Sequence, residues 1–329
     1  MISNIDISIC IPTFNRAHTL RSLLSSIESE INSLQYYQIE IVISDNASTD
    51  DTARLVEHFS KRLDIVNYVK LPENRGLGYN INNAINTAKG RFCWLMGSDE
   101  KLYPGSLAKI ISELESDSDI LIGNPITNNS ERIFFREKKY NYSVDSPQEI
   151  ARFIDNCTEL SSFFAFISTI VVKKSFWNKC EFPLEWINHT YTHLLRLVSI
   201  IKAGETKIKT LGYPIVITGN EMNEWNKRIF NHFSLDNETL FLISHSIFED
   251  NSEIKSAISG LISRQYNSFN ILLSRSAASK EEWNTLIPIL KYLEIGSGMY
   301  KKEIYDPILY IMYRTAKKFK VIVKKLKAI

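Results

Sequence analysis

Two adjacent carboxylates, Asp99 and Glu100, follow a short apolar run at residues 91–96 that has the composition of a buried strand. Carboxylate oxygens are the ligands that Mg²⁺ and Mn²⁺ take in proteins, and such ions are commonly shared with substrate phosphates. The same pair could be a solvated acidic turn or a helix N-cap, because a short motif is weak evidence outside its structural context. The loop therefore allows two interpretations, a metal and phosphate site or an acidic turn.

A second polar loop begins at Asp45. Ser48 or Asp50 can cap the helix expected to follow it. Asp45 and Asn46 precede that cap, so they are expected to hydrogen-bond a base or a ribose. This prediction depends on where the loop lies in the fold.

Two arginines, Arg16 and Arg75, stand in two further polar loops. A guanidinium can balance phosphate charge, although a lone arginine on a surface is usually only solvated. The sequence leaves both interpretations open.

The elements that carry these loops alternate between strand and helix patterns. The expected strands are 5–11, 39–43, 65–71 and 91–96, and the expected helices between them are 22–34, 52–63 and 80–89. Such alternation predicts an α/β fold of Rossmann-like type, with a mainly parallel sheet and helices on both faces. Ligands of these sheets bind beyond the carboxyl ends of the strands. The four loops after the strands are therefore expected to form one site.

The order and spacing of these segments resemble the family 2 glycosyltransferases with the GT-A fold. The resemblance is carried by residues 9–16 (ICIPTFNR), 43–50 (ISDNASTD), 74–88 and 94–107, which cover about the first 110 residues. The sequence of residues 93–100, CWLMGSDE, further resembles bacterial O-antigen abequosyltransferase-like members of that family.

The resemblance implies a nucleotide-sugar site drawn from all four loops. Its members would be Pro12, Thr13, Arg16, Asp45, Asn46, Arg75, Ser98 and Asp99. Many relatives have a second Asp that accepts from uracil N3–H where this chain has Asn46. An amide can donate as well as accept, which would tolerate cytosine and favours a CDP-sugar donor.

The resemblance also implies a divalent cation, Mg²⁺ or Mn²⁺. The family's Asp-x-Asp motif stands here as Gly97-Ser98-Asp99, so its first carboxylate is absent. Asp99 is the expected metal or ribose contact and Glu100 its support, with metal dependence left open.

A catalytic base is implied at the start of a helix that ends in Ala-Gly, where many relatives have an Asp. Counting back from Gly204 places His193 near that position, with His189 and Glu185 as further candidates. The two histidines are four residues apart and are predicted to share a helix face. They could instead be zinc ligands, but the Glu of a zinc-protease helix is replaced by Thr190. A third interpretation is two half-buried histidines packed among aromatic side chains.

After about residue 220 the strand patterns end and helical patterns follow one another, at 235–248, 253–273 and 281–293. We therefore expect a catalytic domain at 1–219 and an α-helical region at 220–329.

The C-terminal segment from Asp306-Pro307 predicts a basic amphipathic helix. Its cations are Arg314, Lys317, Lys318, Lys320, Lys324, Lys325 and Lys327, and the rest of the chain has 32 basic and 37 acidic residues, a net charge of −5. Such a helix can bind an anionic membrane surface or pack on its own domain with a solvated lysine face. A basic excess confined to one terminal segment does not favour a nucleic-acid partner.

The resulting expectation is a glycosyltransferase that moves a hexosyl or deoxyhexosyl group, such as a 3,6-dideoxyhexose, from a nucleoside-diphosphate donor. The acceptor would be a polyprenyl-diphosphate-linked oligosaccharide of O-antigen, in lipopolysaccharide or other surface-polysaccharide synthesis. The N-terminus does not have a signal-peptide pattern, so a cytoplasmic enzyme, peripheral on the inner face of the cytoplasmic membrane, is expected. Two alternatives are a catalytically inactive GT-A scaffold that binds carbohydrate or a partner enzyme, and a dinucleotide-dependent oxidoreductase. The oxidoreductase lacks its Gly-x-Gly-x-x-Gly motif after the first strand.

Overall fold

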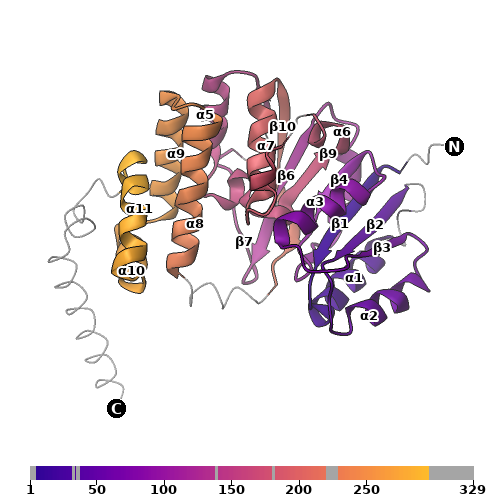
Figure 1. Ribbon diagram of the computed structural model, residues 1–329. Coiled ribbons are helices and arrows are strands. Elements are labelled where there is room, and N and C mark those ends of the chain that lie inside the picture. The colour runs from indigo at the N-terminus through magenta and orange to yellow at the C-terminus, as the bar shows by residue number, and fades with distance from the viewer. Residues whose placement is uncertain are drawn as a thin grey trace, which may run out of the picture. The chain divides into compact units, whose positions relative to one another are not determined.

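The computed structural model describes residues 5–31, 34, 38–137, 140–179, 182–219 and 229–295. The chain divides into two compact units, Met1–Glu221 and Met222–Ile329, which are described separately (Figure 1). The basic segment at 306–329 lies outside the described residues.

A ten-stranded mixed sheet forms the centre of the first unit, in the order β3-β2-β1-β4-β9-β6-β10-β5, with β7 beside β6 and β8 beside β10. The strands are β1 (Ile7–Thr13), β2 (Ile39–Asp45), β3 (Val66–Lys70), β4 (Phe92–Leu95), β5 (Lys101–Leu102), β6 (Ile120–Thr127), β7 (Ser130–Glu131), β8 (Tyr140–Val144), β9 (Ile170–Lys173) and β10 (Thr206–Ile217). Strands β1 to β4 are parallel, and β9 runs antiparallel to both β4 and β6. The predicted parallel half of the sheet is confirmed.

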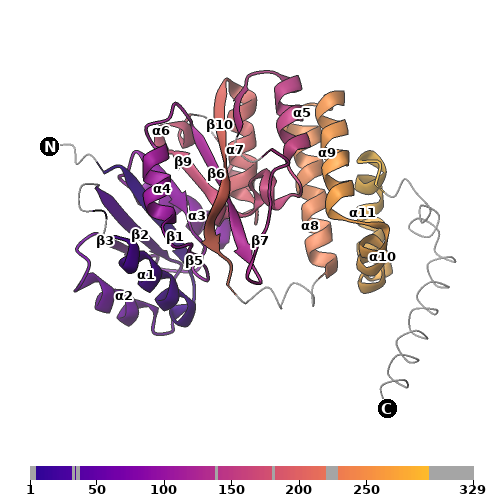
Figure 2. The same ribbon diagram turned by 180° about the vertical axis from the view of Figure 1, so that it is seen from behind.

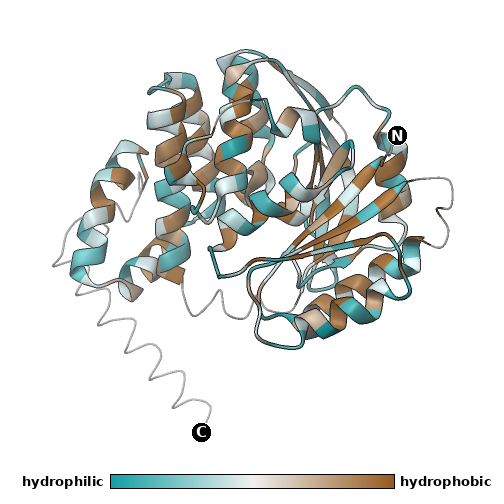
Figure 3. Cartoon of the chain, turned by 45° about the vertical axis from the view of Figure 1, so that its right-hand side comes forward, coloured by the Kyte–Doolittle hydropathy of each residue, from teal (hydrophilic) through white to brown (hydrophobic). Residues whose placement is uncertain are grey.

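Helices cover both faces of this sheet, as the alternating pattern predicted (Figures 1 and 2). The helices of this unit are α1 (Ala17–Ile31), α2 (Thr52–Ser60), α3 (Leu77–Thr87), α4 (Ser106–Glu113), α5 (Pro147–Asn156), α6 (Lys174–Trp177) and α7 (Thr192–Ala203). Ile7, Ile9 and Ile11 belong to a buried core with α1, α2 and α4, whereas α3 packs against β1 and β2. Figure 3 shows the result, with mainly brown strands between helices that carry both colours.

Buried amides fix α3 to the carboxyl ends of β1 and β2. Ser44 Oγ donates to Asn80 Oδ1 at 2.6 Å, and Asn80 Nδ2 donates to the carbonyl of Thr13 at 3.2 Å. Asn83 Nδ2 donates to Ser44 Oγ at 2.8 Å. Because buried polar groups are costly without partners, these contacts hold the start of each neighbouring loop in one position.

The apolar run at 160–172 is divided into three pieces. They are a π-helical turn (Ser161–Ala165), a 3₁₀ turn (Ile167–Thr169) and the start of β9. Phe164 lies in the left-handed region at φ 62°, which ends any regular helix there.

The described part of the second unit is helical. Its elements are α8 (Ile229–Phe241), a π-helical turn (Leu242–Ile247), α9 (Ser252–Gln265), α10 (Ser268–Ala277) and α11 (Lys280–Tyr292). The single helix expected at 253–273 is wrong, because Asn267 interrupts it and caps α10 by accepting from Asn270 N at 2.9 Å.

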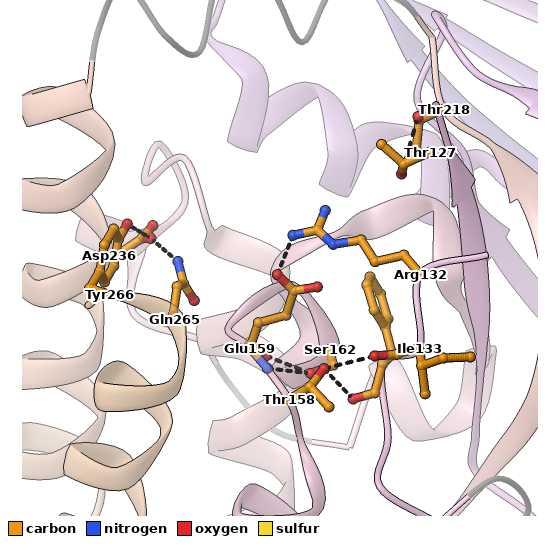
Figure 4. Close-up of polar contacts among 11 residues, drawn as sticks. Thr127, Arg132, Ile133, Thr158, Glu159, Ser162, Thr218, Asp236, Gln265 and Tyr266 are labelled. Atoms are coloured by element: carbon orange, nitrogen blue, oxygen red, sulfur yellow. Dashed lines mark hydrogen bonds and ion pairs between the residues drawn. The ribbon is translucent and has the colours of Figure 1, made fainter. Parts of the chain in front are cut away.

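A buried carboxylate joins two helices of this second unit. Asp236 of α8 is 1% exposed and accepts from Gln265 Nε2 at 2.7 Å and from Tyr266 OH at 2.5 Å (Figure 4). These two bonds link α8 to the end of α9.

The helices of the described segments are all too short or too polar to cross a membrane. Cys10, Cys93 and Cys157 are buried and free.

Candidate active site

Four loops after β1 to β4 meet at one edge of the sheet. Asn15 N donates to Ser48 Oγ at 2.8 Å, and Ala17 N donates to Asp50 Oδ2 at 3.0 Å, which joins the first loop to the second. Arg16 joins the first loop to the fourth through Asp99. The predicted convergence of these loops is therefore present.

Asp45 is fully buried and supports its own loop. Its Oδ1 accepts from Ser48 N at 2.8 Å, and its Oδ2 accepts from Tyr68 OH at 2.5 Å. Burial and the hydrogen bond to Asp45 raise the pKa of Tyr68 well above its ordinary value. Both carboxylate oxygens thus have protein partners.

The amide of Asn46 is committed to the neighbouring loop. Nδ2 donates to Asn74 Oδ1 at 2.7 Å and to the carbonyl of Gly76 at 3.2 Å, and Oδ1 accepts from Arg75 N at 2.9 Å. Asn46 is 3% exposed. These contacts give no support to base reading by Asn46 or to the preference for a CDP-sugar.

Asp99 forms an ion pair with Arg16. Arg16 Nη1 and Asp99 Oδ2 are 2.8 Å apart, with the side chains 38% and 22% exposed. This pair puts a cation and a carboxylate together at the ligand edge of the sheet.

Glu100 is buried and bonded to the backbone. Its Oε2 accepts from Gly219 N at 2.9 Å, and the residue is 6% exposed. Burial and the neighbouring charge of Asp99 raise the pKa of Glu100 to about 8. Burial thus disfavours the charged form of Glu100.

A metal held by two carboxylates does not fit these residues. Asp99 is paired with a guanidinium, Glu100 is bound to backbone, and Gly97 stands where the family has its first carboxylate. Within the described ranges no group of three or more His, Cys, Asp or Glu side chains could hold a metal ion.

The remaining predicted nucleotide contacts lie in the same loops. Pro12, Thr13 and Ser98 are buried, and Thr13 Oγ1 has no hydrogen-bond partner within the part of the chain described. The guanidinium of Arg75 lies 3.8 Å from the centroid of the Tyr79 ring. Thr13 and Arg75 thus offer a buried hydroxyl and an exposed cation.

The prediction that His189 and His193 share a helix face is wrong. Helix α7 begins at Thr192, and His189 lies in the turns before it, where its amide N donates to the carbonyl of Trp186 at 3.1 Å. Its ring Nδ1 accepts from Tyr191 N at 3.1 Å. The neutral ring therefore carries its proton on Nε2, which is then a donor.

His193 is buried behind the site. It is 2% exposed, its Nε2 lies 3.2 Å from the carbonyl oxygen of Ala165, and burial lowers its pKa to about 4. Glu185, in contrast, is exposed, in a 3₁₀ turn at Leu184–Trp186. Their roles as catalytic bases stay predictions.

The loop that carries Glu185 and His189 packs closely on the start of α3. A Cβ placed on Gly78 would lie 2.2 Å from the carbonyl oxygen of Ile187 and 2.8 Å from that of His189. Only glycine lets the two backbones approach so closely. This contact brings the candidate bases beside the loop that holds Arg75.

A family model described as Glycosyl transferase family 2 matches residues 8–176, slightly more than half of the 329 residues. The chain is a family 2 glycosyltransferase. The expected GT-A fold is likewise present.

Among curated proteins, this glycosyltransferase is similar to abequosyltransferase RfbV of Salmonella typhimurium. The two are 28% identical over 231 residues, which cover 68% of this chain and 69% of the relative. It also resembles the GalNAc(5)-diNAcBac-PP-undecaprenol beta-1,3-glucosyltransferase of Campylobacter jejuni, with 30% identity over 120 residues, 36% of this chain and 37% of that protein.

Among solved structures, the fold is similar to S. aureus TarS 1-349, with a TM-score of 0.60 and 20% identity over 88% of this chain and 80% of that one. The same protein in complex with UDP gives a TM-score of 0.58 and 18% identity over 94% and 92%. This likeness shows the fold of the glycosyltransferase.

Several polar contacts of this glycosyltransferase were not predicted. Arg132 pairs with Glu159, whose pKa is raised because burial outweighs the attraction of the guanidinium (Figure 4). Ser168 Oγ accepts from Gly97 N at 3.0 Å and so supports the Asp99 loop. These partners are 27 and 71 residues apart, and no short motif signals such distant pairs.

Proposed function

We propose that the first unit binds a nucleoside-diphosphate sugar where its four loops meet and transfers the sugar to a lipid-linked oligosaccharide. The observation that carries this proposal is the Arg16–Asp99 pair, which closes the loops after β1 and β4 at the ligand edge of the sheet. Membership of family 2 supports transfer from a nucleotide sugar. Within the chain we assign this activity to residues 1–219, and we treat 220–329 as a helical region.

The abequosyltransferase relative supports a 3,6-dideoxyhexose as the transferred sugar, in O-antigen synthesis. The undecaprenol-linked substrate in the name of the Campylobacter relative supports a polyprenyl-diphosphate acceptor. We propose no base preference, because the amide of Asn46 is bonded to its own loop.

Cations of the loops would stabilise the diphosphate as it leaves. Arg16 and Arg75 are both in position to do so at the loop edge, since a guanidinium binds phosphate oxygens through paired N–H donors. Asp99 holds Arg16 in place and is the proposed ribose contact.

Glu185 is the candidate base best suited to an acceptor hydroxyl. Its carboxylate is exposed, whereas His193 is buried and the Nδ1 lone pair of His189 is used by a backbone amide. Replacing Glu185 by Gln should lower kcat by about a hundredfold or more without weakening donor binding.

Transfer assays on the full chain test the function. We would measure nucleoside diphosphate released from a panel of nucleotide sugars, with polyprenyl-linked oligosaccharide as acceptor. Release is expected from the wild type and from Asp64→Ala, whose side chain is exposed, and it should be lost in Asp99→Ala. Equal release from all three proteins would contradict the proposed site, and no release from any protein would favour the inactive scaffold.

The basic segment at 306–329 is proposed to dock the enzyme on an anionic leaflet. Each surface Lys or Arg contributes about 1 kcal/mol to such binding. Full-length protein should float with anionic vesicles, and replacing Lys317, Lys318, Lys324 and Lys325 by Gln should weaken flotation. Undiminished flotation of a chain that lacks 306–329 would rule the segment out.

A further inference from the structure

The positive charge beside Asp99 is the side chain of Arg16. Arg16 Nη1 lies 2.8 Å from Asp99 Oδ2, and only about a fifth of the Asp99 side chain is exposed. A salt bridge of this length is a charge-assisted hydrogen bond, stronger than a contact between neutral groups.

The fold holds Arg16 in this position. Its carbonyl accepts from Leu20 N at 2.9 Å and from Thr19 Oγ1 at 3.2 Å, in the first turn of α1. The next residue, Ala17, donates its amide to Asp50 Oδ2. The carbonyl of Arg16 is thus bonded to the first turn of α1, and the adjoining amide of Ala17 to the loop before α2.

The second carboxylate is bonded to the backbone. Glu100 Oε2 accepts from Gly219 N, and a Cβ on Gly219 would lie 2.2 Å from the carbonyl oxygen of Asp99. The end of β10 therefore packs directly on the Asp99 loop. Glu100 cannot turn toward Asp99 without giving up its backbone partner.

The balance of charges also favours a guanidinium over a metal ion beside Asp99. Two carboxylates and a divalent cation together carry no net charge, and neither does one carboxylate paired with one guanidinium. A divalent cation added at Asp99 would compete with Arg16 for the carboxylate and would lie beside the arginine charge, which repels it. The single carboxylate fits one guanidinium better than it fits a metal.

We propose that Arg16 replaces the divalent cation in this glycosyltransferase, so that its guanidinium binds Asp99 on one side and the donor diphosphate on the other. A guanidinium has five N–H donors in a planar fork, which allows it to bind a carboxylate and a phosphate together. This inference rests on the proposed function. It makes donor binding independent of metal and keeps metal away from Asp99.

Two measurements on the full-length protein test the proposal. Binding of Mn²⁺ alone is monitored through the loss of the electron paramagnetic resonance signal of free Mn²⁺. Binding of UDP and CDP is measured by calorimetry, in EDTA and in Mn²⁺. The variants are Arg16→Gln, Arg16→Lys and the double change Arg16→Gln with Asp99→Asn. Arg21→Gln is the matched control, because Arg21 is an exposed arginine of α1, the helix that follows Arg16.

The wild type and Arg21→Gln should bind the nucleoside diphosphate equally in EDTA and in Mn²⁺, and should not bind Mn²⁺ alone. Arg16→Gln should lose at least about tenfold in affinity in EDTA, because a charged hydrogen bond to phosphate is lost. Arg16→Gln should also bind Mn²⁺, whereas the double variant should not. Mn²⁺ should restore part of the nucleotide affinity of Arg16→Gln. Arg16→Lys, which keeps the charge, should resemble the wild type in excluding Mn²⁺.

Wild-type affinity that rises about tenfold with Mn²⁺ would overturn the proposal. So would nucleotide binding in EDTA that Arg16→Gln leaves unchanged in a protein with a wild-type melting curve. If no protein binds either nucleotide under any condition, the proposed function fails and this inference fails with it. A failure of the inference alone shows as nucleotide binding that follows Mn²⁺ and not Arg16.

Discussion

At the scale of single residues, polar side chains of the loops form hydrogen bonds within and between the loops. Asp45, Asn46 and Glu100 each form hydrogen bonds with nearby backbone or side-chain groups. Arg16 and Asp99 pair with each other at the open edge. A ligand at this edge would therefore meet loops that their own hydrogen bonds already fix, together with the Arg16–Asp99 ion pair.

The role of Asn46 can be tested by Asn46→Asp. The new carboxylate would face Asn74 Oδ1 and the carbonyl of Gly76, both acceptors, in place of the two N–H bonds. We expect a loss of about 1–3 kcal/mol in the free energy of unfolding and weaker binding of every nucleotide. Urea unfolding and nucleotide titration measure the two effects. A variant of unchanged stability that exchanges CDP for UDP preference would show that Asn46 reads the base.

His193 predicts a pH dependence of stability. Its pKa is about 4 in the folded protein, against about 6.5 when unfolded, because burial disfavours the charged ring. Above pH 6.5 both states are neutral at this site. Between pH 6.5 and 4 the unfolded state binds a proton that the folded state does not, so the free energy of unfolding falls, by at most about 3 kcal/mol.

The control for this effect is His193→Gln, which does not titrate. The wild type should lose more stability than this variant between pH 7 and pH 4.5 in urea unfolding. Parallel losses in both proteins would mean that His193 is not buried in the neutral form.

Sequence patterns could find Arg16 and Asp99, because each stands directly after a strand. They could not find that Asn46 serves the next loop, since its partners lie 28 to 30 residues away. The base candidates also depended on a helix start that spacing alone misplaced, because turns at 186–192 precede α7.

Among the elements, the contact between α3 and the loop before α7 positions the candidate bases. Gly78→Ala would drive a Cβ into the carbonyls of Ile187 and His189. We expect a lower melting temperature and a lower transfer rate, because both backbones must move apart. Gly204→Ala is the control, since a Cβ there meets nothing within 4 Å and its φ of 166° is ordinary extended backbone. Equal melting curves for the two variants would contradict this close approach.

The first half of the sheet was predictable because each strand and helix has its own apolar period. The second half was not, since β9 lies antiparallel between β4 and β6, and β10 pairs with β6, β8 and β5 in different parts of its length. Such pairing is decided by contacts distant in sequence. The division of the helix expected at 253–273 follows from one cap, Asn267, which interrupts an otherwise continuous helical pattern.

For the whole molecule, the proposed site uses residues of the first unit alone. Tyr266→Phe in the second unit removes one of the hydrogen bonds to buried Asp236. The free energy of unfolding of that unit should fall by about 1–3 kcal/mol, because a buried acceptor loses a donor. Nucleotide affinity measured below the unfolding temperature should not change. A parallel loss of affinity would show that the second unit contributes to the donor site.

The net charge of the molecule, +2, combines a body of −5 with a basic C-terminal segment. On the proposed function, a diphosphate ligand would therefore be held by a few placed cations and not by a general positive field. This makes single substitutions at Arg16 and Arg75 informative.

The central claim is that a nucleoside diphosphate binds at the Arg16–Asp99 pair, and a crystal structure of the full chain with UDP or CDP bound tests it most directly. The account predicts a diphosphate oxygen within hydrogen-bond distance of the Arg16 guanidinium, with Asp99 still paired to that side chain. A diphosphate bound out of reach of both Arg16 and Arg75 would contradict it.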